Sequence, residues 1–246
     1  MTGFRAKIAA AMALCGLALG GCATTPPTPE MIANNDPYEP TNREIFAFNM
    51  MWDRTFLVPT VTMYRETVPE GGRQAFHNFL VNLTLPSTFV GDMLQGEMKR
   101  GSQTAGRFLI NTTVGLGGFF DPATTHFDIP GHGEDYGQTF AVWGAEEGPF
   151  LMLPLFGPSN PRDTAGLVAG TALDPTNFIH FKQHIYWIMA RQYFSLLDLR
   201  SQTFDALQGI QRSSVDYYAS LRGLYRQMRN NEIRNGRQEK ADLPDF

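Results

Sequence analysis

The chain has 246 residues, of which 20 are basic and 24 acidic, so its formal net charge is −4 at neutral pH. This mildly acidic balance argues against a nucleic-acid-binding protein, which needs a clustered basic surface. The length suits one domain with a single core of typical size. With only two cysteines, Cys15 and Cys22, close to the N-terminus, we expect packing rather than disulfides to hold the fold.

The first 21 residues have the layout of a secretory signal peptide. Arg5 and Lys7 precede an apolar stretch, Ile8 to Leu19, that is too short to span a membrane. Small residues then lead to Cys22, and this junction resembles a bacterial lipobox, in which the cysteine becomes the acylated N-terminus. A plain cleaved signal would instead leave a lone thiol in an oxidising compartment. We therefore expect Cys22 to be lipidated.

Residues 22–40 predict a flexible tether, because Thr, Pro and Asn are common there and apolar residues are few. Thr41 to Glu44 has the pattern of a capping box, which predicts a helix from about Asn42 to Leu57. Its apolar residues cover more than one face, so this helix is either deeply buried or in contact with lipid. They are Ile45, Phe46, Phe48, Met51, Trp52 and Phe56, and Asn49 is the polar exception among them.

Short amphipathic helices, punctuated by Pro and Gly, are predicted as far as residue 114. Pro59 predicts the end of the preceding helix, and Pro69 suits the first position of another. Pro86 predicts a second break, after which Gly96 caps the following helix. The pattern predicts a mainly α fold with little or no β structure.

The segment from Phe108 to Phe120 is uncharged and contains three glycines, Gly115, Gly117 and Gly118. It is too short to cross a bilayer as a helix, which takes about 20 residues, so it is buried or lies in a membrane interface. We expect a helix to end near these glycines, because glycine adopts positive φ at no cost. Dinucleotide and P-loop motifs are excluded, since Phe120 replaces a required glycine and no Lys follows.

A polar segment then brings together residue types that bind metals. They are His126, Asp128, His132, Glu134 and Asp135. Their spacing matches no metal motif, so we expect an ordinary loop without metal or cofactor. His180 and His184 share a helix face but lack the Glu of a zinc-protease helix. The chain has no G-x-S-x-G elbow and no redox Cys pair, so we expect a protein that is not an enzyme.

The second half of the chain continues as helices and one apolar loop. Phe150 to Phe156 is uncharged and carries a proline, which predicts an extended loop. Asn160 and Pro161 predict the start of a helix, in which Gly166 and Gly170 allow a second helix to approach closely. Further elements are an aromatic amphipathic helix over Phe178 to Leu199, a last helix capped near Ser213 to Asp216, and a disordered tail over 237–246.

Several blocks of the chain resemble the VacJ/MlaA family of outer-membrane lipoproteins. The blocks are Asp36 to Pro40, Asn111 to Ala123, Glu134 to Gly157 and Asp216 to Gly236. The family is known for moving misplaced phospholipid out of the outer leaflet of the Gram-negative outer membrane. The resemblance implies a single helical domain over 41–236, built as a ring or horseshoe of short amphipathic helices lying in the membrane.

The resemblance also implies a location, a function and partners. It implies a lipid-anchored protein on the periplasmic side of the outer membrane that preserves lipid asymmetry by retrograde phospholipid transport. The implied partners are phospholipid, a trimeric porin and a soluble periplasmic carrier. A charged headgroup avoids hydrocarbon, so the lipid needs a polar path. The alternative is a structural lipoprotein that braces a porin without transport.

We expect two groups of residues to act on the lipid. Phe46, Phe48 and Asn49 are predicted to line the path. The glycine-rich stretch and the apolar loop are predicted to form gates or hairpin loops, because Gly and Pro permit such segments to shift. The predicted gate residues are Gly115, Gly117, Gly118, Phe119, Phe120, Leu153, Pro154 and Phe156.

Overall fold

The computed structural model describes residues 26–174, 184–235 and 237. In its first half the elements are α2 (Pro29–Ala33), α3 (Glu39–Trp52), the π-helix η1 (Asp53–Leu57), α4 (Val58–Thr67), α5 (Glu70–Leu94) and α6 (Met98–Thr113). The second half contains α7 (Pro122–Thr125), α8 (Tyr136–Val142), β1 (Leu151–Leu153), β2 (Gly157–Ser159), α9 (Pro161–Leu173), α10 (His184–Gln202), α11 (Phe204–Ser213) and α12 (Tyr217–Ile233). The prediction of a mainly α fold with little β structure is confirmed.

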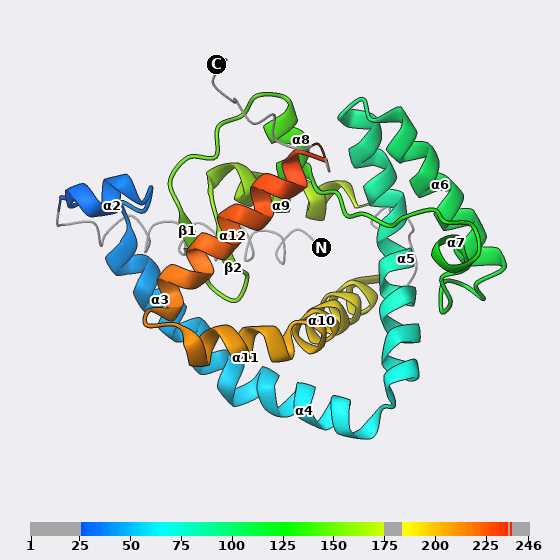
Figure 1. Ribbon diagram of the computed structural model, residues 1–246, viewed down its shortest axis with the longest axis horizontal. Coiled ribbons are helices and arrows are strands. Elements are labelled where there is room, and N and C mark those ends of the chain that lie inside the picture. Colours follow the sequence, from blue (N-terminus) through cyan, green and yellow to red (C-terminus); the bar gives the residue numbers. More distant parts are fainter. Residues whose placement is uncertain (1–25, 175–183, 236, 238–246) are drawn as a thin grey trace, which may run out of the picture.

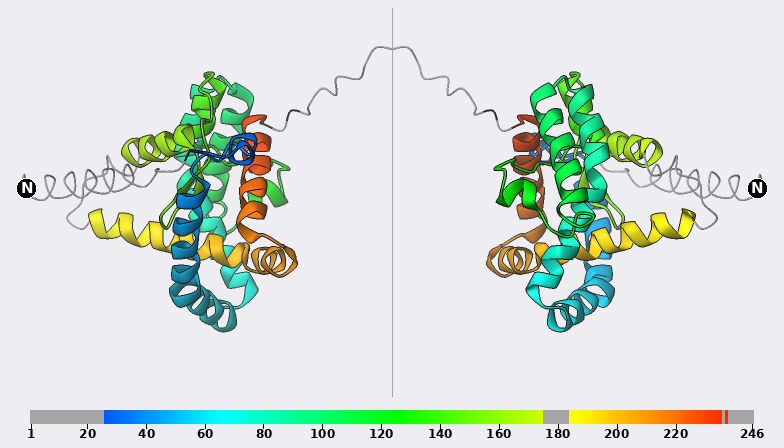
Figure 2. Two further views of the ribbon diagram at one scale, coloured as in Figure 1. Left: turned by 90° about the vertical axis from the view of Figure 1, so that its left-hand side faces the viewer. Right: turned by 90° about the vertical axis from the view of Figure 1, so that its right-hand side faces the viewer.

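The helices are arranged as a ring (Figure 1). Helices α3, η1, α4 and α5 form one arc, and α12 runs from α11 to α8 on the other side. Helix α10 packs on α4 and α5 from inside the arc. Figure 2 shows that α9 and α10 project toward the same side of the ring. This arrangement agrees with the predicted ring or horseshoe, while its place in a membrane stays a prediction.

Two prolines do not break the helices as predicted. Pro59 lies in the first turn of α4, where its missing N–H costs nothing, and η1 joins α3 to α4 without a loop. Pro86 lies inside α5, which continues to Leu94. Helix α6 packs along this part of α5 (Figure 1), and such packing outweighs the loss of one backbone hydrogen bond.

The predicted tether is wrong for residues 28–40. Thr28 caps α2, and α3 begins at Glu39 rather than near Asn42. Asp36 is fully buried, and its carboxylate accepts hydrogen bonds from the Asn42 amide, the Tyr218 hydroxyl and the Arg222 guanidinium. These charge-assisted bonds stabilise a segment whose apolar content alone would leave it disordered.

The predicted apolar loop forms a β-hairpin with two short strands. Strand β1 pairs antiparallel with β2, with Met152 opposite Pro158. Pro154 lies in the turn between the strands, so it interrupts no ladder hydrogen bond. Phe150 and Met152 form the core cluster with Tyr218 of α12. Side chains of Ile45, Phe46 and Tyr225 pack around this cluster.

Two local predictions are confirmed where α8 meets α9. The Asn160 side chain accepts a hydrogen bond from the Asp163 amide, and Pro161 opens α9. A Cβ on Gly166 would lie 2.3 Å from the backbone nitrogen of Gly137, so only glycine permits this helix contact.

The distribution of polarity is unusual for a globular protein. Among the described residues, ten apolar side chains are buried against fifteen polar or charged ones. Large apolar side chains are exposed on α9 and α10, among them Val168, Leu173, Ile185, Tyr186 and Met189. Exposed apolar patches and buried polar groups are the informative deviations from ordinary burial. The interior is therefore held largely by polar networks, and much of the outer surface is apolar.

Candidate functional site

Helix α5 carries a row of mostly polar or small residues along one side. Their spacing of three or four residues places them on neighbouring turns. The row consists of Gln74, His77, Asn78, Val81, Thr84, Ser87, Thr88 and Gly91. All eight line cavities of the structure. We call them the α5 row.

The first cavity lies where α5 faces α8, α9 and α10, and its volume is about 420 Å³. Besides the α5 row, its walls carry the hydroxyls of Thr171 and Ser195 and the amide of Gln192. Its charged groups are the ion pair between Arg191 and Asp174, together with two carboxylates of the loop before α8. The cavity wall therefore combines hydrogen-bonding groups with paired charge.

Two further cavities continue along α5. The second, of about 420 Å³, lies between α5, α6 and the loop before α8. It shares Thr84 and Gly133 with the first cavity. The third, of about 520 Å³, lies beside α7 and the glycine-rich stretch and shares Gln74 and Asn78 with the second. The three cavities thus adjoin one another along one side of a single helix.

The second cavity contains the charged groups with the clearest electrostatic roles. Arg107, 3% exposed, donates to the Asp121 carboxylate at 2.8 Å and to the Thr124 hydroxyl at 2.6 Å. Burial alone would raise the pKa of Asp121, but hydrogen bonds from Thr124, Arg107 and Asn111 lower it overall. His77 Nδ1 lies 2.8 Å from Asp198 Oδ2 of α10. The hydrogen bond with Asp198 raises the pKa of His77.

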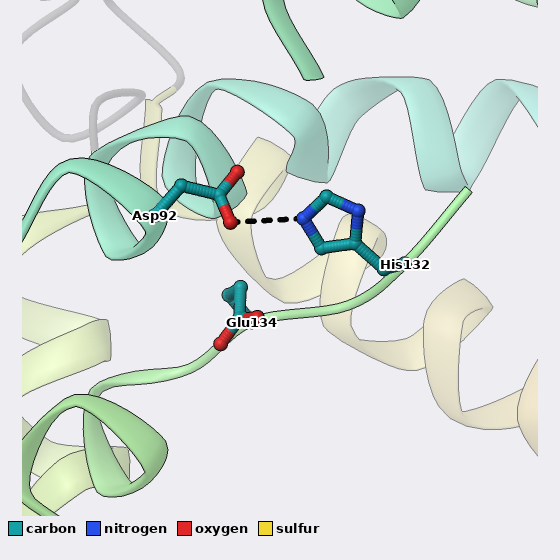
Figure 3. Close-up of side chains that lie close together, drawn as sticks. All are labelled: Asp92, His132 and Glu134. Carbon is teal, nitrogen blue, oxygen red and sulfur yellow. Dashed lines mark hydrogen bonds and ion pairs between the residues drawn. The ribbon is translucent and has the colours of Figure 1, made fainter. Parts of the chain in front are cut away.

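Asp92, His132 and Glu134 form a compact cluster beside the first two cavities (Figure 3). Their nearest ligand atoms all lie within 4.8 Å of one another, and all three residue types bind metals. The guanidinium of Arg100 lies 2.6 Å from Glu134 and 3.7 Å from Asp92. A cation is therefore already present among these carboxylates. His126, Asp128 and Asp135, which belong to the same segment of the sequence, do not join this cluster.

This cluster does not have the geometry of a catalytic triad. His132 Nε2 lies near both the Asp92 carboxylate, at 2.9 Å, and the Thr104 hydroxyl, at 3.4 Å. A general base needs one ring nitrogen for the nucleophile and the other for the carboxylate. The Thr104 hydroxyl already donates to Asp92 at 2.6 Å and is buried. The cluster therefore joins α5, α6 and the loop before α8.

The glycine-rich stretch forms a tight loop after α6. Gly117 and Gly118 have positive φ angles of 74° and 97°. A Cβ on Gly118 would lie 2.5 Å from the Asn82 side chain, and one on Gly115 would lie 2.5 Å from two backbone oxygens. Phe119 stacks on Phe79 of α5 with ring centroids 4.9 Å apart, yet Phe119 and Phe120 stay exposed. The loop has a defined conformation and presents aromatic rings outward.

The other predicted site residues belong to α3 and the hairpin. The Asn49 amide donates to Leu153 O at 2.9 Å and accepts from Leu155 N at 2.8 Å. The structure therefore brings Asn49 together with the predicted hairpin gate, in which Pro154 and Phe156 are exposed. Phe46 packs against the core cluster and Phe48 is exposed, and neither lines the three cavities of α5. Their role in a lipid path stays a prediction.

The α5 row was missed in the sequence because the prediction followed apolar periodicity. The signal was present as polar and small residues at helical spacing from Gln74 to Gly91. The expected break at Pro86 divided this row between two helices. Asp198, which pairs with His77, and Arg107, which lines the second cavity with the row, are distant from it in sequence, so their proximity depends on the tertiary fold.

A buried ion-pair network joins the two helices beside the first cavity to α12. Arg229 donates to Asp135, which caps α8, and to Asp163 in the first turn of α9. Burial would raise the pKa of Asp163, but hydrogen bonds from Arg229, Tyr225 and Arg162 lower it. The network therefore ties α8 and α9, which both line the first cavity, to α12.

A search of the described helices for a membrane span identifies none that is long and apolar enough. Other predictions concern residues outside the described ranges. They are the signal segment, Cys22, His180, Phe178 and most of the predicted tail. Lipidation of Cys22 therefore stays a prediction.

Comparisons with known proteins agree with these features. The model of the MlaA lipoprotein family matches residues 34–232. The intermembrane phospholipid transport system lipoprotein MlaA of Escherichia coli K12 is 31% identical over 231 residues, which are 92% of this chain and 88% of that protein. The protein of the same name from Haemophilus influenzae is 28% identical over 238 residues, covering 94% and 93% of the two chains.

A solved structure from a study of the maintenance of bacterial outer membrane lipid asymmetry has a similar fold. Its TM-score is 0.70 at 29% sequence identity, and the match covers 80% of this chain and 98% of that chain. An uncharacterised protein of Rickettsia bellii is 31% identical over 210 residues, which are 85% of this chain and 81% of that protein. With a family match over most of its length, the chain belongs to the MlaA lipoprotein family.

Proposed function

We propose that this protein removes mislocalised phospholipid from the outer leaflet of a Gram-negative outer membrane. The single observation that carries the proposal is the series of three adjoining cavities along the α5 row. Relatives named as parts of an intermembrane phospholipid transport system support it. The reaction is transfer without bond making or breaking, so the protein is not an enzyme.

The physical argument concerns the lipid headgroup. A phosphodiester that enters hydrocarbon loses its hydration at a high cost in free energy, whereas acyl chains enter hydrocarbon without such a cost. The α5 row offers hydroxyls, amides and an imidazole to the headgroup. The apolar side chains exposed on α9 and α10 suit acyl chains. An amphipathic lipid can thus follow α5 without complete desolvation of its charge.

The location follows from two anchors. Acyl chains on Cys22 would hold the N-terminus in the outer membrane, and two lipid signals bind a membrane far more stably than one. The projecting helices α9 and α10 supply a second apolar attachment (Figure 2). We place the protein on the periplasmic side, with these helices in the inner part of the membrane.

Two protein partners complete the proposal. A trimeric porin would hold the ring in the membrane, and a soluble periplasmic carrier would receive the lipid for retrograde transport. The glycine-rich stretch and the hairpin would act as gates beside this route. The competing function is a structural brace for a porin, which is favoured by the amount of exposed apolar surface.

Native mass spectrometry of gently extracted protein separates the two functions. A conduit should retain phospholipid, together with porin or alone, and a diglyceride should not replace it. A brace should carry porin and no phospholipid. Porin bound to protein that is free of lipid in repeated preparations would contradict the transport proposal.

A further inference from the structure

Two imidazoles face the second cavity, and each is backed by a carboxylate. His77 comes from α5 and His132 from the loop before α8. His77 Nδ1 lies 2.8 Å from Asp198, whose side chain is 9% exposed. His132 Nε2 lies 2.9 Å from Asp92, whose side chain is fully buried. The same pairing of an imidazole with a carboxylate therefore occurs twice, on two separate elements, around a single cavity of about 420 Å³.

The second nitrogen of each ring is available for a ligand. Within the part of the chain that the structure describes, His77 Nε2 and His132 Nδ1 have no hydrogen-bond partner. A carboxylate on one ring nitrogen favours the protonated imidazole, in which the other nitrogen is a donor. Asp198 raises the pKa of His77 in this way, although burial opposes it. His77, which lines the cavity, can therefore donate a hydrogen bond from Nε2 to a ligand there.

The remaining charged groups around the pair are already engaged. Arg107 on the cavity wall binds Asp121, and both line the cavity. Tyr64 on α4 is the other titratable group that senses Asp198. Burial of its phenol is the main reason that its pKa is raised, and the charge of Asp198 is the second. The Arg100 guanidinium lies beside Asp92 and Glu134 rather than on the wall. Among the charged and ionisable groups that line this cavity, the two imidazoles thus each keep one ring nitrogen for a ligand.

We propose that His77 and His132 bind the phosphodiester of a phospholipid headgroup as it occupies the second cavity. The inference rests on the proposed transport function and names the group recognised at this point of the route. Charge-assisted N–H to oxyanion bonds are among the stronger hydrogen bonds, and two donors that line one cavity suit the two free oxygens of a phosphodiester. The neighbouring amides of Gln74 and Asn78 supply neutral donors to the rest of the headgroup.

The test uses the purified mature lipoprotein in detergent with ¹³C-labelled histidine. The chain has five histidines, so single His→Gln variants assign each imidazole signal. The probes are dihexanoylphosphatidylglycerol, inorganic phosphate and dihexanoylglycerol. The phospholipid should shift the imidazole signals of His77 and His132, while the signal of His184, which lies outside the three cavities, stays unchanged. The other two probes should shift neither imidazole.

Affinity gives a second readout. The double variant His77→Gln with His132→Gln should bind the short-chain phospholipid about tenfold more weakly at about pH 6, and His77→Lys should recover part of this loss. His184→Gln is the matched control. Binding of the phospholipid to the parent protein should weaken as the pH rises above the pKa of the folded His77 imidazole. Unchanged thermal unfolding of each variant excludes loss of the fold.

Each contrary result has a separate meaning. If inorganic phosphate shifts both imidazoles as strongly as the phospholipid, the site binds free phosphate and the headgroup inference is wrong. If dihexanoylglycerol shifts them, phosphate recognition is wrong. If the phospholipid shifts neither while the parent still transports lipid in cells, this inference fails and the proposed function stands. If the parent transports no lipid, the proposed function itself fails.

Discussion

Buried charge contributes strongly to stability at the level of single residues, and Asp163 illustrates how. Its side chain is 9% exposed and accepts hydrogen bonds from Arg229 and Tyr225. The pKa of the folded carboxyl is lowered, so its stabilisation is present above the unfolded pKa and is lost as the pH falls toward the folded value.

Asp163→Asn should therefore lower the free energy of unfolding by about 3 kcal/mol at neutral pH, because Arg229 loses part of a buried ion pair. The difference from the parent should shrink as the pH falls below about 4, because the carboxyl of the unfolded parent then takes up a proton while the folded carboxyl, with its lowered pKa, does so only at lower pH. Denaturant unfolding at several pH values measures both effects. Asp205→Asn is the matched control, since Asp205 is a surface partner of Arg65 and should change stability little. A loss for Asp163→Asn that is the same at all pH values would contradict this account.

Gly117 and Gly118 should differ in their tolerance of a side chain. Both have positive φ, so Gly117→Ala should cost about 1 kcal/mol for the left-handed backbone alone. Gly118→Ala adds a Cβ 2.5 Å from Asn82, and overpacking of this kind costs about 1–3 kcal/mol more. The free energies of unfolding of the two variants should show this order. Equal losses would mean that Asn82 moves aside without cost.

The β-hairpin depends on one side chain of α3. Asn49→Leu removes the hydrogen bonds to Leu153 and Leu155, which should cost about 1 kcal/mol each and loosen the hairpin. Amide exchange of Leu155 should accelerate, and lipid passage should slow if the hairpin is a gate. Phe48→Leu, a change at an exposed neighbour on α3, should leave this exchange rate unchanged. Unaltered protection of Leu155 in Asn49→Leu would show that the strand pairing alone holds the turn.

Elements that depend on local chemistry were predictable from the sequence. Asn160 with Pro161 marks the start of α9, and the glycines after α6 mark its end, because capping and positive φ involve only neighbouring residues. The effect of Pro86 was not predictable, since packing by α6 decides whether α5 continues. The strand pairing of the hairpin was not predictable either, because its two short strands pair only where α3 and α12 support them.

The candidate site was predictable only in part. The helical spacing of the α5 row can be read from the chain, whereas the approach of Asp198 to His77 spans 121 residues. The same holds for Asp36, whose bond to Arg222 joins residues 186 positions apart and orders a segment with the composition of a tether. Long-range polar contacts of this kind leave no periodic signal in a sequence.

At the scale of the whole molecule, the apolar surface should keep the protein on the membrane without its acyl anchor. A protease site placed just before Thr28 would release the N-terminus and leave α2 intact. The cleaved domain should stay in the membrane fraction after a high-salt wash, because α9 and α10 expose large apolar side chains. A variant with Val168, Ile185 and Met189 changed to Ser should be released. Full release of the parent domain would mean that the lipid anchor alone holds it.

The central claim is that phospholipid leaves the outer leaflet along α5, and outer-leaflet phospholipid measured with an impermeant label tests it most directly. Thr84 borders both the first and the second cavity, so Thr84→Trp should fill the route, whereas Phe89→Trp on the same helix lies outside all three cavities. Cells lacking the protein and cells carrying Thr84→Trp should accumulate labelled phospholipid, and cells with Phe89→Trp should match the parent at equal protein level. If cells lacking the protein label no more strongly than the parent, or if Thr84→Trp behaves like Phe89→Trp, the account is contradicted.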